Sequence, residues 1–322
     1  MRLALYGEQG FYNTIGAAGR RGDFLTSPEV GPLFGAVVAR WIDSAWREMG
    51  KPDDFTIVEA GAGPGTLARS IRAGSPECLD VAQYIAVEVS QAQRDRHPDW
   101  VRSTDAFPAE RFSGVVIANE LLDNLPLRLF VNDGGWREAF VALDPTSERF
   151  VEVLGSGPTP ADFALPPRAP HGARVPLQDA ASAWIQAVLH ALVNGRLLLV
   201  DYASPTTAAL ADRPWRDWLR TYRSHQRGEH YLRDPGTQDI TAEVALDQIF
   251  AVNGEPTAIR SQQQFLQLWG IDALVEEGRR VWSQSAGQPT LTAMTMRSRV
   301  REAEALCDPH GLGSFSVIEF VR

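Results

Sequence analysis

Apolar runs alternate with helix-spaced segments between residues 55 and 120 of this 322-residue chain. The alternation predicts strand, helix, strand, helix and strand, in chain order, at Phe55–Ala60, Thr66–Arg72, Tyr84–Glu88, Gln91–Arg96 and Val115–Ala118. A short additional strand is expected at Trp100–Thr104. Units of this kind are right-handed βαβ crossovers, with helices on both faces of a parallel sheet. The sequence therefore predicts an α/β fold built on a mostly parallel sheet.

Beyond residue 120 the pattern becomes mixed. Two β-rich runs, Leu127–Phe130 and Trp136–Ala142, flank the turn Asn132–Gly135 and predict a hairpin. The stretch from Gly155 to Pro176 is dense in proline and glycine, so we expect an irregular connection there. The remaining expected elements are a helix at Asp179–Leu192, a strand at Arg196–Asp201, helices near 261–268 and 271–283, and strands at Leu291–Met296 and Phe315–Val321, the last one antiparallel at the sheet edge.

These elements indicate one core with insertions. An N-terminal helical segment, residues 1–50, is expected to cover the ligand site of the core. The core takes residues 51–126 and 186–322. The insertions are 127–185, which carries the hairpin, and 203–260, a polar segment rich in Trp and Arg that is expected on the substrate side.

The composition fits a globular protein, because 44% apolar residues are enough for a full core. A net charge of −9 and a pI near 5.2 argue against a general nucleic-acid binder, which would carry basic footprints for phosphates. Cys78 and Cys307 are far apart, so neither a disulfide framework nor a zinc site is expected, and a reducing cytoplasm fits. No segment approaches the ~20 apolar residues of a membrane helix.

The loop after the first strand carries the strongest chemical signal. Gly61, Gly63 and Gly65 alternate after Glu59 and before a predicted helix. Without side chains the backbone can turn sharply and approach a ligand, and the helix N-terminus points N–H groups at it. A dinucleotide fingerprint would need glycine in place of Thr66, and a phosphate loop would need Gly-Lys-Ser/Thr, which is absent. The remaining pattern, acid-x-Gly-x-Gly-x-Gly, resembles the S-adenosylmethionine (SAM) loop of Rossmann-like methyltransferases.

Two acids farther along support the same site. Glu88 ends the second strand, where a carboxylate suits hydrogen bonds to two ribose hydroxyls. Alternatively, Glu88 caps a helix that Ser90 opens. Asp105 follows the third strand, where this fold class places an adenine contact, although Asp before Ala-Phe-Pro is equally a turn residue.

Five motifs then occur in a fixed order along the chain. They are Gly22–Glu29 with Leu33–Gly35, Glu59–Leu67, Asn119–Pro126, Thr221–His225 and Pro235–Thr241. In this order they resemble the MidA-like family of SAM-dependent methyltransferases, which includes a mitochondrial complex I assembly factor that methylates arginine. The resemblance runs from about Leu5 to Phe315. It implies a Rossmann-like class I SAM methyltransferase sheet with an antiparallel edge strand and with helical and hairpin insertions.

The resemblance also implies S-adenosyl-L-methionine as the cofactor and S-adenosyl-L-homocysteine as its product. The residues expected to bind the cofactor are Thr26, Ser27, Glu59, Gly61, Ala62, Gly63, Gly65, Thr66, Leu67, Glu88, Val89, Asp105, Ala106 and Asn119. A second interpretation is open for the first two, because Thr26 or Ser27 can simply cap a helix that begins at Pro28.

Methyl transfer from a sulfonium is an in-line displacement, so the protein mainly aligns the nucleophile and takes its proton. Asn119 and Glu120 are predicted at the carboxyl edge of the sheet, where ligands bind. If the acceptor is a guanidinium, Glu120 and Asp123 are the catalytic candidates that hold it through paired hydrogen bonds. Alternatively, Asp123 and Asn124 only close the turn before Pro126.

His225 and Asp239, from two of the family motifs, are the other catalytic candidates. A histidine can serve as the general base, although a histidine in this setting is also commonly solvated or structural. Trp215 and Trp218 are able to form an aromatic wall for a substrate, or they belong to the core or an interface.

The sequence thus predicts a SAM-dependent methyltransferase that acts on protein arginine. A small-molecule acceptor and a SAM-binding assembly factor with little catalysis stay open as alternatives, and Thr66 disfavours an NAD-dependent oxidoreductase. A protein substrate is the expected partner and a homodimer is a second one. Nucleic acid, a membrane span and a metal are not expected, and the expected location is cytoplasmic.

Overall fold

The structure is a computed structural model that describes residues 1–14, 26–156, 165–223, 226–285, 287–288 and 290–322. Its contacts divide the chain into two compact units. The sheet unit comprises Ala17–Glu120, Leu189–Val200 and Pro256–Arg322. The hairpin unit comprises Met1–Gly16, Leu121–Val188 and Asp201–Glu255. Residues 1–16 therefore group with most of the two expected insertions and not with the remainder of 1–50.

A large sheet forms the centre of the sheet unit. Its strands are β1 (Thr56–Ala60), β2 (Gln83–Val87), β3 (Arg102–Thr104), β4 (Phe112–Asn119), β9 (Leu192–Asp201), β15 (Ala258–Ser261) and β16 (Ser316–Val321). Among the described residues the sheet has seven strands in the order β15-β16-β9-β4-β1-β2-β3. The strands from β9 to β3 pair in parallel, and β15 pairs with β16 antiparallel. The predicted mostly parallel sheet is confirmed.

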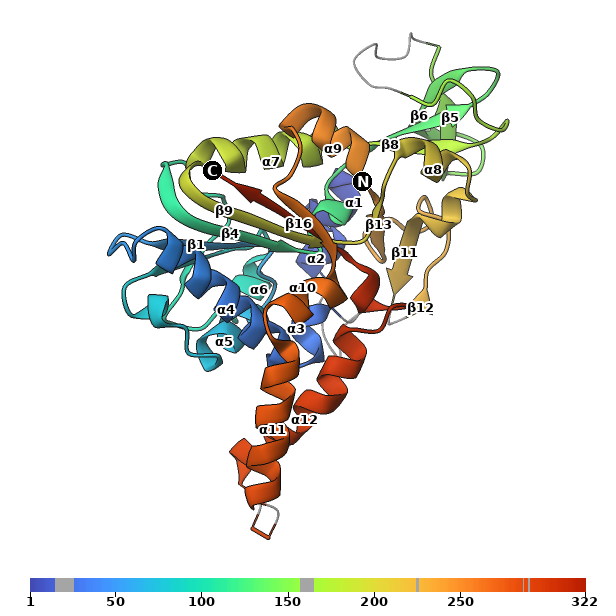
Figure 1. Ribbon diagram of the computed structural model, residues 1–322. Helices are drawn as coiled ribbons and strands as arrows, with labels where there is room; N and C mark the ends of the chain where they lie inside the picture. The colour runs from blue at the N-terminus through green and yellow to red at the C-terminus, as the bar shows by residue number, and fades with distance from the viewer. Residues whose placement is uncertain (15–25, 157–164, 224–225, 286, 289) are drawn as a thin grey trace. The chain divides into compact units, whose positions relative to one another are not determined.

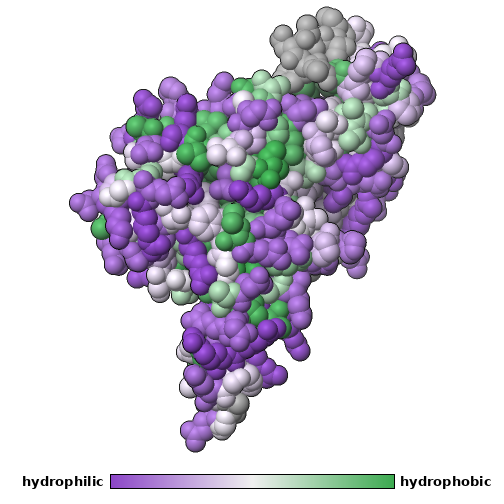
Figure 2. All heavy atoms as spheres, in the orientation of Figure 1, coloured by the Kyte–Doolittle hydropathy of each residue, from purple (hydrophilic) through white to green (hydrophobic). Residues whose placement is uncertain are grey.

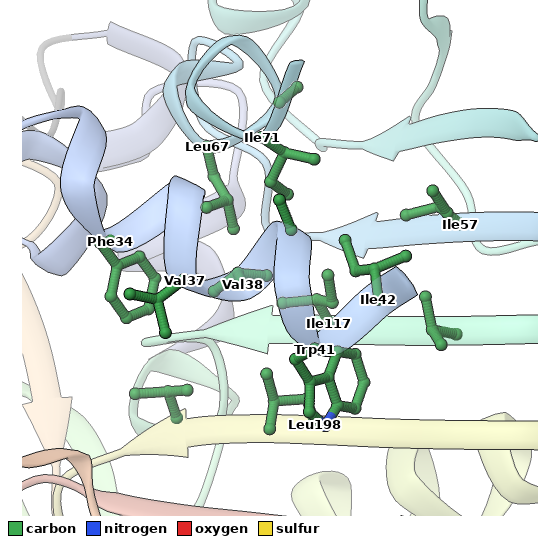
Figure 3. Packing of buried hydrophobic residues seen from close by; sticks show 14 of the residues in the cluster. Phe34, Val37, Val38, Trp41, Ile42, Ile57, Leu67, Ile71, Ile117 and Leu198 are labelled. Atoms are coloured by element: carbon green, nitrogen blue, oxygen red, sulfur yellow. The ribbon is translucent and has the colours of Figure 1, made fainter. Parts of the chain in front are cut away.

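The sheet unit also contains helices, several of which cover the sheet (Figure 1). They are α3 (Ser27–Val30), α4 (Pro32–Glu48), α5 (Thr66–Ala73), α6 (Gln91–Arg94), α10 (Gln262–Leu268), α11 (Ile271–Ser285) and α12 (Leu291–Leu306), with short 3-10 turns η1 (Glu77–Asp80) and η4 (Leu312–Ser314). Apolar residues three and four apart give α4 a continuous buried face. Figure 3 shows this face, with Val38, Trp41 and Ile42, beside side chains of the sheet and of α5. Burial of each such side chain stabilises the fold by about 1.5–3 kcal/mol.

Helices α11 and α12 form a helical hairpin that extends away from the sheet (Figure 1). Near its base the buried carboxylate of Glu302 accepts the backbone N–H of Leu33, at 2.9 Å, in the first turn of α4. Ser298 donates its hydroxyl to the same carboxylate. A side chain at Gly31 would collide with this carboxylate, because its Cβ would lie 2.3 Å from Glu302 Cδ. The negative group therefore offsets the positive end of the α4 dipole.

The hairpin unit contains smaller sheets and short helices. A four-stranded sheet in the described residues has the order β7-β6-β5-β8, made of β5 (Arg128–Asn132), β6 (Trp136–Asp144), β7 (Arg149–Leu154) and β8 (Arg174–Leu177). The other strands are β10 (Ala203–Ser204), β11 (Leu219–Arg223), β12 (Gln226–Arg227), β13 (Asp239–Ala242) and β14 (Val244–Ala245). The helices are α1 (Arg2–Tyr6), α2 (Phe11–Thr14), η2 (Leu122–Asn124), α8 (Thr207–Ala211), η3 (Trp215–Asp217) and α9 (Leu246–Asn253). Helix α7 (Asp179–Ala191) leads from this unit into the sheet unit.

The antiparallel pairing of β5 with β6 confirms the predicted hairpin.

Three predictions about secondary structure differ from the structure. Leu291–Met296 begins helix α12 and is not a strand, because Thr290 caps a helix there by accepting the N–H of Ala293 at 3.1 Å. The sheet does have an antiparallel edge strand, but this strand is β15 and not the predicted β16, which lies one place inside the edge. Arg174–Leu177 is a strand inside the stretch expected to be irregular, and its Pro176 is tolerated because β8 lies at a sheet edge.

The surface is mostly hydrophilic on the face drawn in Figure 2, with hydrophobic side chains in small groups. None of the helices in the described part of the chain combines the length and the hydropathy that a membrane span requires.

Candidate functional site

The glycine loop lies in the sheet unit between β1 and α5. Gly61, Gly63 and Gly65 have φ angles of +70°, +51° and +77°, a left-handed backbone that glycine adopts without strain. The N–H groups of Gly61 and Ala62 both donate to the carbonyl of Val87, at 2.9 and 3.0 Å, which ties the loop to the end of β2. A Cβ placed on Gly63 would meet no atom within 4 Å. The loop is therefore fixed at its start and open at its centre.

His97 supports this loop, and the sequence analysis missed it. Its Nε2 lies 2.8 Å from the carbonyl oxygen of Gly63, and its Nδ1 lies 2.8 Å from Ser103 Oγ. Because a carbonyl only accepts, Nε2 must carry the proton. The ring is also close to Gly65, where an added Cβ would lie 3.3 Å from His97 Cδ2. No sequence spacing marks this residue, since it reaches the loop across 34 positions.

His97→Ala is expected to weaken binding of S-adenosyl-homocysteine about fivefold. The change removes one hydrogen bond that orders the loop, worth about 1 kcal/mol. Isothermal titration calorimetry measures the effect, with the exposed His310→Ala as the matched control. Equal affinities for the two variants would contradict the supporting role.

Glu88 directly follows β2 and faces the glycine loop. Its carboxylate accepts the N–H of Gly63 through Oε2 and the N–H of Ser90 through Oε1, both at 2.9 Å. Ser90 is also the residue before α6, so the helix-capping interpretation and the loop interpretation both apply to this carboxylate. Each carboxylate oxygen has a second lone pair, which leaves room for hydroxyl donors.

Glu59 lies buried at the end of β1. The hydroxyl of Tyr84 donates to its Oε2 at 2.6 Å. Burial raises the pKa of Glu59 to about 7, although the Tyr84 hydrogen bond opposes the shift. Burial also raises the pKa of Tyr84 well above its usual value.

Glu59 is expected to make the protein less stable as the pH rises from 5 to 8. Between pH 4.5 and 7 the unfolded chain loses this proton while the folded chain keeps it, so the free energy of unfolding falls with pH. The two pKa values imply a fall of about 2 kcal/mol from this group. Urea denaturation at both pH values measures it, and Glu59→Gln should remove this part of the fall while still accepting from Tyr84. The same fall in the variant would contradict the assignment.

The carboxyl end of β4 places Asn119 and Glu120 together. The Asn119 amide donates to Glu120 Oε1 at 3.0 Å, and the Glu120 N–H donates to the carbonyl of Val200 at 2.8 Å. Asn119 Oδ1 is buried and makes no hydrogen bond with the described residues. Glu120 has a φ of +51°, a strained conformation that is typical of functional positions.

Three aspartates lie buried in the hairpin unit. Asp201 accepts the N–H groups of Leu122 and Asp123, at 2.9 and 3.3 Å. Asp239 accepts from the Tyr12 hydroxyl and from the Asn124 amide, both at 3.1 Å. We call Asp123, Asp201 and Asp239 the aspartate cluster. Asp123 lies in η2, Asp239 lies in β13, and Asp201, the last residue of β9, is the residue at which the hairpin unit resumes.

Asp123 is the member of this cluster with an open acceptor. Tyr202 donates its hydroxyl to Oδ2 of Asp123, and Oδ1 is buried with no hydrogen-bond partner in the described part of the chain. Burial, followed by the negative charge of Asp201, raises the pKa of Asp123 well above its usual range. A bound cation would lower the pKa of Asp123 again, because it would compensate the buried negative charge.

The other predicted site residues are less involved. Ser27 is fully buried and donates to Gln262 Oε1 at 2.8 Å, so its geometry gives no support to a cofactor contact. Thr26 precedes α3 as its N-cap residue without a side-chain hydrogen bond. Asp105 and Ala106 form an exposed bend after β3, which agrees with the turn interpretation. Val89 is exposed as well. His225 lies outside the described residues.

The two tryptophans differ from each other. Trp218 is fully buried, which agrees with the core interpretation. Trp215 is partly exposed and contacts the rings of His230 and Tyr231 edge to face, at 5.5 and 5.8 Å.

The residues of the sheet unit fit an adenosyl cofactor. Gly63 is open on its Cβ side, and α5 begins after Gly65 without a side-chain cap hydrogen bond. The buried Asn119 Oδ1 and Ser90 Oγ still lack partners among the described residues. The described part of the chain contains no group of His, Cys, Asp and Glu that is suited to a metal ion.

Comparisons with known proteins agree with this geometry. A family model described as an S-adenosyl-L-methionine-dependent methyltransferase matches residues 37–263. The mitochondrial protein arginine methyltransferase NDUFAF7 of Rattus norvegicus is 28% identical, over 95% of this chain and 75% of that protein. The NDUFAF7 homolog of Drosophila melanogaster is 31% identical, over 76% of this chain and 63% of that protein.

Solved structures give the same result. A COG1565 superfamily member from Burkholderia thailandensis, bound to S-adenosyl-homocysteine, superposes with a TM-score of 0.83 at 29% identity. The match covers 100% of this chain and 86% of that chain. A native structure from the same organism has a TM-score of 0.80 at 28% identity. The predicted SAM methyltransferase fold and the predicted cofactor are confirmed.

The expected cytoplasmic location is wrong, because the curated relatives are named as mitochondrial proteins. The expectation depended on two distant cysteines, and free cysteines indicate a reducing environment without specifying a compartment. The match over residues 37–263 spans most of the chain. The chain belongs to the MidA-like family of S-adenosyl-L-methionine-dependent methyltransferases.

Proposed function

We propose that this methyltransferase transfers the methyl group of SAM to an arginine side chain of a protein. The observation that carries the proposal is Asp123, a buried carboxylate with an open acceptor oxygen three residues after Glu120. The names of the relatives support the acceptor, since they are protein arginine methyltransferases. A guanidinium stays charged and presents several N–H donors in a fixed plane, which suits buried carboxylates.

In this proposal the sheet unit binds the cofactor. The glycine loop approaches the adenosyl group with its main chain, and Glu88 accepts from the ribose hydroxyls. Asp105 and Ala106 contact the adenine, and Asn119 offers its open Oδ1. SAM supplies a methyl group on a sulfonium, an electrophile that needs no covalent enzyme intermediate.

The carboxylates hold and polarise the acceptor. Glu120 and Asp123 accept N–H groups of the guanidinium, which draws positive charge away from the nitrogen that attacks. Asp239 completes the negative environment and is oriented by Tyr12 and Asn124. His225 is the proposed proton acceptor on the ground of its motif. Arrival of the guanidinium compensates the charge of Asp123 and lowers its pKa.

The roles expected for two segments of the chain are part of the proposal. Residues 1–50 are proposed to serve the cofactor site, and residues 203–260 are proposed to serve the acceptor. A homodimer is a separate part of the proposal about partners. Sedimentation equilibrium tests it, because a single species at the monomer mass of 35.4 kDa would contradict the dimer.

The test incubates the purified protein with methyl-labelled SAM and a lysate from its own source, then identifies the labelled band and the modified side chain. Labelled arginine in a protein is the expected result. Label in small molecules alone would overturn the protein acceptor. Binding of S-adenosyl-homocysteine without any transfer would favour an assembly factor, and thermal protection by NAD but not by SAM would overturn the cofactor.

A further inference from the structure

The hairpin unit carries a cationic segment in an acidic protein. Residues 213–233 contain six arginines and two acidic residues, whereas the whole chain has a net charge of −9. Part of this segment lines a hollow of about 490 Å³. Its walls include Trp215, Arg216, Arg220, Arg227, His230 and Tyr231. The catalytic proposal uses none of these residues.

Two guanidinium groups lie over the ring of Trp215. Arg174 is 4.9 Å and Arg216 is 5.0 Å from the ring centre. Glu152 neutralises Arg174 at 2.6 Å, whereas Arg216 has no carboxylate within ion-pair distance in the described part of the chain. Arg216 is exposed and thus presents an uncompensated cation that is already oriented by an aromatic ring.

The other two arginines of the hollow differ in how closely a carboxylate pairs with them. Arg220 pairs with the buried Glu243 at 3.0 Å. Arg227 is more than half exposed and donates one N–H to the carbonyl of Arg216. It lies 4.0 Å from Asp217, a loose contact that an anionic ligand can replace. Burial, and next the charge of Arg216, lower the pKa of His230. The hollow therefore has two available guanidinium groups beside neutral aromatic rings.

A second hollow, of about 590 Å³, adjoins the first and has a different character. His230 lines both of them. The second hollow includes Phe150 and Val151 of β7 with Leu232 and Pro235. Phe150 is half exposed, as are other large apolar side chains of β6 and β7, such as Phe140 and Val153. The remaining lining is charged, with both acidic and basic side chains, so the apolar residues form one patch of this hollow. His230 is shared by this hollow and the anion-binding one.

We propose that the two hollows bind an extended acidic segment of the protein substrate, with a carboxylate side chain at Arg216 and Arg227 and a large apolar side chain against Phe150. Charge complementarity selects this occupant, because planar guanidinium groups bind carboxylates in a bidentate manner. The proposal rests on the proposed function only in naming the partner as the methylated protein. Such a surface would add specificity to the methylation of one arginine.

The test measures fluorescence anisotropy with the full chain and a labelled decapeptide of glutamates around one phenylalanine. The matched peptides carry glutamine in place of glutamate, or glycine in place of phenylalanine. Binding of the acidic peptide is expected to weaken about tenfold in Arg216→Ala and again in Arg227→Ala, since each loses a charged hydrogen bond. Arg111→Ala, an exposed arginine of the sheet unit, is the control and should leave binding unchanged.

Phe150→Ser tests the second hollow separately. It should weaken binding of the phenylalanine peptide and leave the glycine peptide unaffected. Equal binding of the glutamate and glutamine peptides, or no response to Arg216→Ala, would overturn the proposal. Tighter binding of an RNA oligonucleotide at the same arginines would also overturn it, because the partner would then be a phosphate polymer. Calorimetry with S-adenosyl-homocysteine on the same samples reports cofactor binding independently, so failure of this surface is distinct from failure of the proposed function.

Discussion

Asp123→Asn is expected to lower the rate of arginine methylation by about 10²–10³-fold, the usual effect of removing one preorganised electrostatic group from a reaction centre. The amide keeps the size of the side chain but loses the negative charge that would hold the guanidinium. Glu120→Gln should act in the same direction. Single-turnover transfer from labelled SAM to the identified acceptor measures both variants.

The variant should stay folded and still bind the cofactor. Burial raises the pKa of Asp123, so its ionised form destabilises the native state and a neutral amide removes this cost. Affinity for S-adenosyl-homocysteine is expected to change by less than about twofold, because Asp123 has no assigned contact with the cofactor. Glu304→Gln, an exposed change on α12, is the control. Unchanged methylation by Asp123→Asn would remove the aspartate cluster from the mechanism.

Gly114→Ala is expected to lower the free energy of unfolding by on the order of 3 kcal/mol. Gly114 lies in the middle of the parallel sheet, paired with Thr56 of β1 on one side and Gly195 of β9 on the other. Its φ is +154°, and an added Cβ would lie 1.8 Å from the carbonyl oxygen of Thr56. That oxygen belongs to the main chain of a central strand, so the clash is relieved only by moving the strand itself.

Gly134→Ala is the matched control for this change. Gly134 also has a positive φ, of +71°, but no atom lies within 4 Å of its Cβ position. It should cost only about 1 kcal/mol of backbone strain. Urea denaturation followed by tryptophan fluorescence compares the two variants. Similar denaturation midpoints would mean that backbone strain alone, and not the close approach of β1, causes the loss of stability in Gly114→Ala.

The sequence predicted those elements whose pattern is decided locally. Buried parallel strands are continuous apolar runs, so β1, β2, β4 and β9 were found, and the glycine loop was identified by its spacing. The run at Leu291 failed because a short apolar stretch does not distinguish a strand from the start of a helix. Strand β8 failed because its partner β5 lies more than 40 residues away in sequence and proline is a poor strand signal.

The site residues also divide into those marked by the local sequence and those that depend on distant contacts. Asn119 ends β4, and Glu88 and Glu120 directly follow β2 and β4, so their strand-end positions made them visible in the sequence. The supporting groups depend on contacts between distant segments. His97 reaches Gly63 across 34 positions, and Tyr12 reaches Asp239 across 227. Such partners carry no periodicity, so the sequence alone gives no reason to choose them.

The contact between Glu302 and the start of α4 limits how far helices α11 and α12 can be shortened. Shortening the pair at its tip should leave this contact intact if Ser298 and the buried Ala293 and Glu302 are kept. A deletion that removes Glu302 would leave the backbone N–H of Leu33 without its acceptor, in the turn of α4 where Gly35 packs closely on Ser70 of α5. The α11–α12 hairpin therefore stabilises the start of α4 through Glu302. A homologue without this part of the hairpin would need another acidic residue to accept the N–H of the first turn of α4.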